Sequence, residues 1–174
     1  ERKIVSFFQK WKNDLIRKPL VVYGPKQVGK TFTVLNFGKN EYKNVIYINA
    51  TNNKRLIELF EKEKSIDKLI VNLSLMSGET ILQNDTLIIF DNVNDVEIIK
   101  GLKLFGSINS PYHIIAITSR RENLKEFKGV ELQFKGMTGM DFQAFKETQY
   151  DILAAELRKH LDMKKIYDIL EQGI

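Results

Sequence analysis

Five short runs of apolar residues recur along the chain and constrain its fold more than any other feature. The runs cover residues 20–23, 45–48, 86–90, 113–118 and 130–134. The runs are largely continuous rather than alternating, which is typical of strands covered by helices on both faces. Helical segments separate the runs, and this alternation favours a parallel sheet with right-handed crossovers. The sequence therefore predicts an α/β fold of three layers, with a five-stranded parallel sheet between helices.

The helices are predicted from apolar periodicity and from residues that begin or end helices. Apolar side chains recur every three or four positions from Ile4 to Leu15, and Pro19 stops this first helix. Gly38 is expected to close the second helix. Helices are predicted over 2–17, 29–37, 53–62, 65–76 and 94–106, from Thr138 onward with Asp141 in a capping box, and over 150–172.

The stretch between the first apolar run and the second helix has a pattern of its own. It satisfies G-x-x-x-x-G-K-[ST], the Walker A phosphate loop, with residues Gly24, Pro25, Lys26, Gln27, Val28, Gly29, Lys30 and Thr31. Its glycines let the backbone wrap closely around phosphate, and successive N–H groups form an anion nest. The following helix presents its free N–H groups and positive dipole end to the same phosphates. We therefore expect the loop to bind a nucleoside triphosphate, with Mg·ATP as its ligand.

Lys30, Thr31 and Asp91 are the candidates for contact with the phosphates and their metal ion. Lys30 would place a point charge on the β- and γ-phosphates, and Thr31 would offer its hydroxyl to Mg²⁺. Asp91 ends the apolar run 86–90, where the carboxyl edge of a parallel sheet faces the ligand crevice. We expect Asp91 to hold Mg²⁺ through its water shell. The alternative for Asp91 is a residue that merely ends a strand and caps the next turn.

Asn92 stands where many ATPases have a glutamate that polarises the attacking water. A neutral amide can orient water, but it cannot accept the proton of that water at useful strength. Asp95 could replace the glutamate if the turn bends back, although its spacing does not suit an extended strand end. The sequence therefore supports nucleotide binding strongly and hydrolysis weakly.

The fourth apolar run ends in Thr118 and is followed by Ser119, Arg120 and Arg121. A hydroxyl at this strand end could sense the γ-phosphate or position water, and an ordinary helix N-cap is the alternative. The two arginines could stabilise charge on the transferring phosphate, or they could be solvated surface residues.

The composition excludes several kinds of site. The chain has no cysteine and two histidines, which rules out disulfides and thiolate nucleophiles and gives no basis for a transition-metal site. No apolar run approaches the length of a transmembrane helix and no signal peptide is visible, so we expect a cytoplasmic protein without membrane contact. The net charge of +5 favours anionic partners such as a nucleotide, but no arginine-rich tract supports nucleic-acid binding.

Segments within about residues 1–150 resemble the AAA-superfamily ATP-binding proteins of bacteria and archaea that pair an N-terminal ATPase domain with a C-terminal domain of unknown function. The matching segments are the loop 24–31 and residues 46–49, 73–79, 86–91, 111–116 and 140–145. The loop is shared by many families, and the later segments make the match specific. The resemblance implies the sheet order 2-3-4-1-5, with strands numbered along the chain. It also implies Lys30 and Thr31 on phosphate and Mg²⁺, Asp91 near the metal, and Ser119 at the sensor position.

The chain departs from this family in two respects. The family usually has Asp-Glu where this chain has Asp91-Asn92, so the catalytic glutamate is not carried over. Family members also continue beyond the point where this sequence stops. We therefore expect an ATPase domain over residues 1–150. Residues 151–174 are expected to be a helical appendage or the start of a further C-terminal region.

Four functions are compatible with these observations. The first is an AAA-type ATPase or nucleotide-dependent switch that binds Mg·ATP and works with a protein partner or a C-terminal region. The second is an ATP-binding module that does not hydrolyse its ligand, which Asn92 supports. A small-molecule kinase would need a second pocket and an arginine-rich lid, for which the sequence offers no segment. A nucleic-acid-binding module would bind with a strong dependence on salt.

Overall fold

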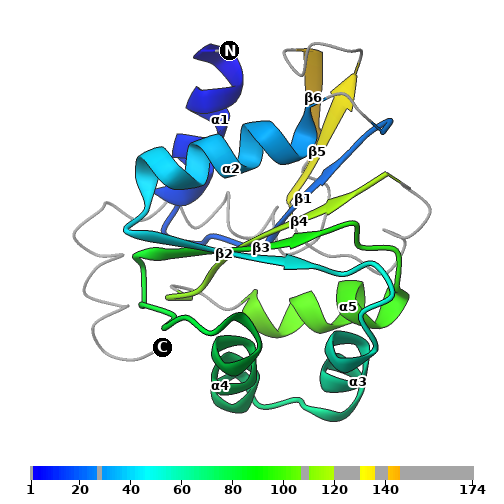
Figure 1. The fold of residues 1–174 in the computed structure, drawn as a ribbon. Helices are drawn as coiled ribbons and strands as arrows, with labels where there is room; N and C mark the ends of the chain where they lie inside the picture. The colour runs from blue at the N-terminus through cyan, green and yellow to red at the C-terminus, as the bar shows by residue number, and fades with distance from the viewer. Residues whose placement is uncertain (1, 27–28, 107–109, 120–129, 136–140, 146–174) are drawn as a thin grey trace.

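The computed structural model describes residues 2–26, 29–106, 110–119, 130–135 and 141–145. A six-stranded sheet with the order β2-β3-β4-β1-β5-β6 forms its centre (Figure 1). The strands are β1 (Leu20–Tyr23), β2 (Asn44–Asn49), β3 (Thr86–Asp91), β4 (His113–Thr118), β5 (Val130–Lys135) and β6 (Asp141–Phe145).

The first five strands are parallel and have the predicted order, with β1 between β4 and β5. The sixth strand corrects two predictions, because β6 pairs antiparallel with β5. The sheet therefore has six strands rather than five, and Asp141 begins a strand rather than lying in the first turn of a helix. The sequence Asp-Phe-Gln-Ala-Phe alternates polar and apolar residues over its first four positions, which suits an edge strand, and pairing with β5 overrides the capping signal.

Helices cover both faces of the sheet and make the three predicted layers (Figure 1). Helices α1 (Arg2–Lys12) and α2 (Lys30–Glu41) lie on one face. Helices α3 (Lys54–Lys62), α4 (Ile66–Ser77) and α5 (Val96–Gly101) lie on the other, and the short 3-10 helix η1 (Leu102–Phe105) follows α5.

Successive strand residues point alternately into two hydrophobic cores. The core under α1 and α2 contains Leu20, Val22, Leu87, Ile89, Ile115 and Ile117, packed against Phe8, Trp11, Val34 and Phe37. The core under α3, α4 and α5 contains Val21, Ile46, Ile48, Ile88, Phe90 and Ile114, packed against Leu56, Phe60, Leu69 and Ile98. Odd-numbered residues of β2 and β3 therefore face α2, which decides the side of the sheet on which Asp91 lies.

Three helices differ from the prediction at their ends. Helix α1 ends at Lys12 rather than at residue 17, because the Asp14 carboxylate accepts the Ile16 N–H at 3.0 Å and turns the chain. Helix α2 continues through Gly38 to Glu41. A Cβ at Gly38 would lie 2.8 Å from the Val45 side chain, so this glycine allows close packing on the sheet rather than ending the helix. The helix predicted over 94–106 is divided into α5 and η1.

Strand β2 is an edge strand, and one of its faces is open. Ile46 and Ile48 are buried, whereas Tyr47 and Asn49 are exposed. The prediction of a strand buried on both faces is therefore wrong for β2.

Among the described residues, none of the helices is both long and apolar enough to span a membrane. The predicted helix over 150–172 lies outside the described residues, as do Thr138, Arg120 and Arg121.

Candidate functional site

The glycine-rich loop connects β1 to α2 at the carboxyl edge of the sheet. Gly29 lies just before α2 with a φ of 89°, a left-handed conformation in which side-chain-bearing residues are strained. Helix α2 begins at Lys30, so its first N–H groups face the loop. Gln27 and Val28 lie outside the described residues.

The ammonium of Lys30 is held against the loop by two backbone carbonyls. It donates to Gly24 O at 2.7 Å and to Pro25 O at 2.5 Å. An ammonium has three donors, so a third can serve a phosphate oxygen. The Lys30 side chain is buried, and burial lowers its pKa, while the Asp91 carboxylate acts in the opposite direction. These contacts hold a positive charge beside Gly24 and Pro25.

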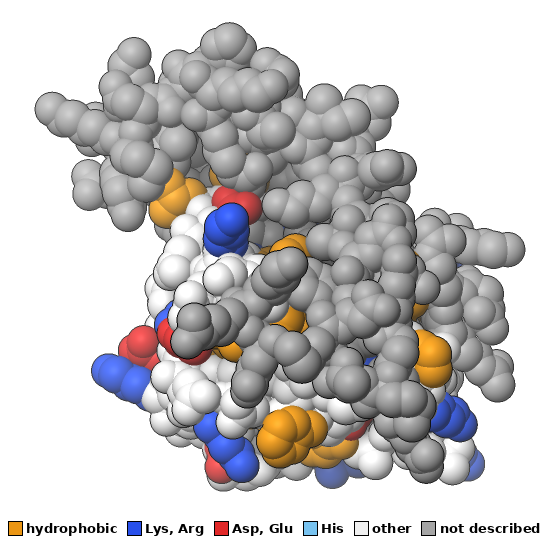
Figure 2. All heavy atoms as spheres, turned by 90° about the horizontal axis from the view of Figure 1, so that it is seen from above, with side chains coloured by type: hydrophobic (Ala, Val, Ile, Leu, Met, Phe, Trp, Pro, Cys, Tyr) orange, Lys and Arg blue, Asp and Glu red, His pale blue; other side chains and the backbone are white. Residues whose placement is uncertain are grey.

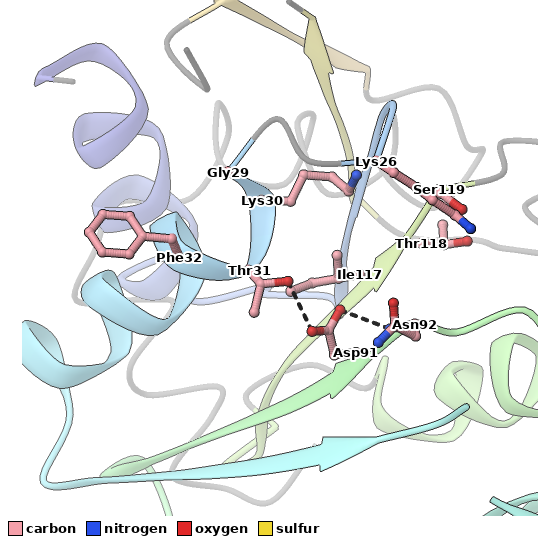
Figure 3. A pocket seen from close by; sticks show the side chains of 10 residues that line it. All are labelled: Lys26, Gly29, Lys30, Thr31, Phe32, Asp91, Asn92, Ile117, Thr118 and Ser119. Carbon is pink, nitrogen blue, oxygen red and sulfur yellow. Dashed lines mark hydrogen bonds between the residues drawn. The ribbon is translucent and has the colours of Figure 1, made fainter. Parts of the chain in front are cut away.

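Thr31 and Asp91 meet beside this lysine. Thr31 is the second residue of α2, Asp91 is the last residue of β3, and both lie on the α2 face of the sheet. The Thr31 hydroxyl donates to Asp91 Oδ2 at 2.9 Å, and the two side chains point toward each other in Figure 3. Asp91 is only 4% exposed. A hydroxyl and a carboxylate side by side are the hard oxygen ligands that Mg²⁺ prefers, usually together with substrate phosphates.

A third side chain, for which the sequence predicts no role, also reaches Asp91. The Tyr47 hydroxyl donates to Asp91 Oδ2 at 2.5 Å from the neighbouring strand β2. Burial, followed by the hydrogen bond to Asp91, raises the pKa of Tyr47 to about 12, so its hydroxyl stays a donor at neutral pH. The sequence offers two signals for Tyr47. It lies in the segment 46–49 that carries the family resemblance, and its polar hydroxyl stands between Ile46 and Ile48, which are both buried.

Asn92 lies at the turn after β3 with a φ of 55°. Its backbone N–H donates to Asp91 Oδ1 at 2.8 Å, and its side-chain amide donates to Asn49 Oδ1 at 3.2 Å. Asp95 does not bend back toward the cleft. Its carboxylate caps α5 by accepting the Glu97 N–H at 2.8 Å.

The phosphate loop and the carboxyl ends of β3 and β4 surround one cleft of about 380 Å³, a size that suits a small ligand (Figure 3). Its lining consists of Lys26, Gly29, Lys30, Thr31, Phe32, Asp91, Asn92, Ile117, Thr118 and Ser119. The structure thus brings four residues of the loop, Lys26 and 29–31, together with Asp91, Asn92 and Ser119, as the sequence predicts. Thr118 is buried and Ser119 is half-buried, at the end of the strand beside β1. Phe32 extends to the other side of α2.

On the face of the molecule that carries α1 and α2, the described charged side chains are of both signs (Figure 2). Viewed from the α1 and α2 side, lysine, arginine and acidic side chains are scattered among uncharged ones on its described part (Figure 2). The described residues also contain no group of three or more His, Cys, Asp or Glu that could hold a metal ion by themselves. A metal at Asp91 would therefore need further oxygens, such as those of Thr31, water or a bound phosphate.

A family model described as an AAA domain matches residues 16–145, which is most of the chain. The chain belongs to this AAA domain family. The strand order and the loop between β1 and α2 agree with the P-loop ATPase fold of such domains. Membership of the family implies nucleotide binding in general terms.

Curated relatives similar to this AAA domain are cobyric acid synthases. One, from Thermoanaerobacter sp. (strain X514), is 38% identical over 74 residues, which cover 40% of this chain and 14% of the relative. Another, from Clostridium novyi (strain NT), is 26% identical over 164 residues, which cover 86% of this chain and 31% of the relative. The matches therefore span less than a third of the length of these relatives.

Among solved structures, the Aeropyrum pernix ORC1 protein in complex with DNA is similar to this chain with a TM-score of 0.46 and 16% sequence identity. The match covers 97% of this chain and 56% of that chain.

Proposed function

We propose that this AAA domain binds Mg·ATP and acts as an ATPase or a nucleotide-dependent switch. The observation that carries the proposal is the position of Lys30. Its ammonium is buried and held by the carbonyls of Gly24 and Pro25, at the mouth of a helix whose first N–H groups are free for an anion. A buried cation beside a helix N-terminus is a site for phosphate oxygens.

The remaining residues of the site are assigned by their chemistry. The backbone N–H groups of the loop 24–31 would surround the phosphates, and Lys30 would neutralise the β- and γ-phosphates. Thr31 and Asp91 would hold Mg²⁺, and their paired oxygens fit this ion. When bound, the metal supplies charge neutralisation of the phosphate oxygens. Ser119, which follows β4 and lines the cleft, would contact the terminal phosphate.

A second candidate is an ATP-binding module that does not hydrolyse its ligand. Asn92 supports it, because an amide accepts a proton poorly and this amide already donates to Asn49. Asp91 is the single carboxylate among the described residues that line the cleft, and it would be occupied by the metal. Asp95, the other candidate base, caps α5. Hydrolysis would then depend on a group supplied from outside these residues, such as a protein partner or a C-terminal region.

The domain boundaries and the location stay predictions from the sequence. We propose residues 1–150 as the ATPase domain and residues 151–174 as an appended region. The proposals of a cytoplasmic location and of a protein partner rest on the same sequence arguments.

The test of nucleotide binding compares the parent with Lys30→Ala by calorimetry with Mg·ATP. We expect Lys30→Ala to lower affinity about tenfold or more, because a charged hydrogen bond contributes roughly 1.5–3 kcal/mol. Lys39→Ala is the matched control, since Lys39 is an exposed lysine in the last turn of the same helix. Equal affinity of the parent and Lys30→Ala would contradict the proposal.

Phosphate release from Mg·ATP separates the two candidate functions. Turnover in the parent that Lys30→Ala abolishes supports an ATPase whose water is activated by a group other than Asn92. Binding without turnover in the parent, together with turnover in Asn92→Glu, supports the non-hydrolysing module. Binding without turnover in either protein would contradict the account in which Asn92 alone causes the defect.

A further inference from the structure

Tyr47 makes a contact that its place in the fold does not require. It lies in the middle of the edge strand β2, and its side chain is 42% exposed. Nevertheless its hydroxyl donates at 2.5 Å to Asp91 Oδ2, an atom of a side chain that is only 4% exposed. A tyrosine that served only to cover the sheet would not need this hydrogen bond.

The strand register explains how Tyr47 reaches the carboxylate. In the pairing of β2 with β3, Tyr47 lies beside Ile89 and Asn49 lies beside Asp91. Tyr47 and Asp91 share the α2 face because odd-numbered residues of both strands point that way. The ring of Tyr47 therefore extends diagonally across two residue positions, a distance that long side chains can span.

Three donors together fix the orientation of the Asp91 carboxylate. The hydroxyls of Tyr47 and Thr31 both donate to Oδ2, and the backbone N–H of Asn92 donates to Oδ1. Thr31 can keep this hydrogen bond while it offers an oxygen lone pair to a cation, because a hydroxyl is both donor and acceptor. Tyr47 holds the same oxygen from strand β2, outside the phosphate loop.

We propose that Tyr47 is a positioning residue for Asp91, which sets the Thr31–Asp91 pair for the divalent cation that accompanies a nucleoside triphosphate. This inference rests on the proposed function. Groups that hydrogen-bond to metal ligands orient them, and their loss commonly lowers metal affinity or activity about 10–100-fold. Tyr47 acts through Asp91 and does not itself touch the ligand.

The test is a Mg²⁺ titration of ATP binding by the parent and by Tyr47→Phe, with a second series in EDTA. Removal of the hydroxyl should raise the Mg²⁺ concentration at half-saturation about tenfold. Metal-free ATP binding should stay unchanged, because the loop and Lys30 are intact. Tyr112→Phe is the matched control, since Tyr112 packs against Phe105 and is absent from the residues that line the cleft.

A double-mutant cycle shows whether Tyr47 acts through Asp91. In the Asp91→Asn background, Tyr47→Phe should cause no further change in the Mg²⁺ requirement, because the two substitutions remove one shared element. Additive effects would overturn the inference. An unchanged Mg²⁺ midpoint in Tyr47→Phe would also overturn the inference. A lower midpoint would overturn it too, because it would mean that the Tyr47 hydroxyl competes with the metal for Asp91. A parent that does not bind Mg·ATP at all would overturn the proposed function and this inference together.

Discussion

At the scale of single residues, Gly29 has a left-handed backbone conformation on which the shape of the phosphate loop depends. Its φ of 89° lies in the left-handed region, and a Cβ placed there would meet no atom within 4 Å. A substitution would therefore cost backbone strain and cause no steric clash. Gly78, which follows α4, has the same two properties, with a φ of 72° and open space where a Cβ would lie.

We predict that Gly29→Ala and Gly78→Ala lower the free energy of unfolding by a similar amount, about 1–2 kcal/mol each. Gly29→Ala should also weaken Mg·ATP binding, because relief of the strain would turn the loop N–H groups away from the phosphates. Gly78→Ala should leave binding unchanged. Urea unfolding and calorimetry measure the two quantities, and equal nucleotide affinity in the two variants would contradict the role of Gly29.

Residues of the site differ in how far the sequence could predict them. Lys30 and Thr31 follow from the loop pattern, and Asp91 follows from its place at the end of an apolar run. Tyr47 could not be predicted, because its role depends on the register between β2 and β3, which the sequence of one strand does not contain. The role of Asp95 could not be predicted either, since only the structure reveals that its carboxylate caps α5.

At the scale of elements, the packing of α3 against α5 depends on the absence of one side chain. A Cβ at Gly101, the last residue of α5, would lie 2.1 Å from the ring of Phe60 in α3. Phe60 is fully buried, so its ring has little freedom to move. The steric conflict should outweigh the gain of about 1 kcal/mol that alanine brings over glycine within a helix.

We predict that Gly101→Ala lowers the free energy of unfolding by about 1–3 kcal/mol, as overpacked cores usually do. Phe60→Leu alone should also destabilise the protein, since it removes buried ring atoms. In the double variant the alanine should cost less than it does in the parent, because leucine leaves room for it. Urea unfolding of the four proteins measures this coupling, and simple additivity would contradict it.

The elements that the sequence predicts less well are those decided by tertiary contacts. A glycine such as Gly38 commonly ends a helix, yet α2 passes through it because glycine allows the close approach to Val45. Gly101 likewise lies at the junction of α5 and η1, where periodicity indicates one continuous helix. Strand β6 replaces a predicted helix because it pairs with β5. By contrast, the bounds of α3, α4 and the five parallel strands agree closely with the predicted ones.

At the scale of the whole molecule, the two ends of the parallel strands differ in their exposure to solvent. The carboxyl edge carries the open cleft, whereas His113 begins β4 at the other edge and is 3% exposed. His113 Nδ1 lies 2.6 Å from the Tyr42 hydroxyl, and Nε2 is buried without a hydrogen-bond partner among the described atoms. Burial, followed by the charges of Arg17 and Lys12, lowers the pKa of His113 to about 3 from an ordinary 6.5.

This buried histidine should make the protein sensitive to mild acid. Between pH 6.5 and about 3 the unfolded chain binds a proton at His113 that the folded chain does not, so the free energy of unfolding falls as the pH falls. Well above pH 6.5 His113 is neutral in both the folded and the unfolded chain, so its effect on the free energy of unfolding no longer changes with pH. From pH 6.5 to pH 5 the loss is about 2 kcal/mol, at roughly 1.4 kcal/mol for each pH unit. Urea unfolding at pH 7 and pH 5 measures it.

The variant His113→Gln separates this histidine from the carboxylates that titrate at lower pH. It should lose about 2 kcal/mol less than the parent between pH 7 and pH 5, because no proton can be gained at that position on unfolding. Tyr42→Phe is the control, since it removes the neighbouring hydroxyl but keeps the buried ring of His113 and should retain the acid sensitivity. Equal losses in the parent and in His113→Gln would mean that the acid sensitivity of the fold arises elsewhere.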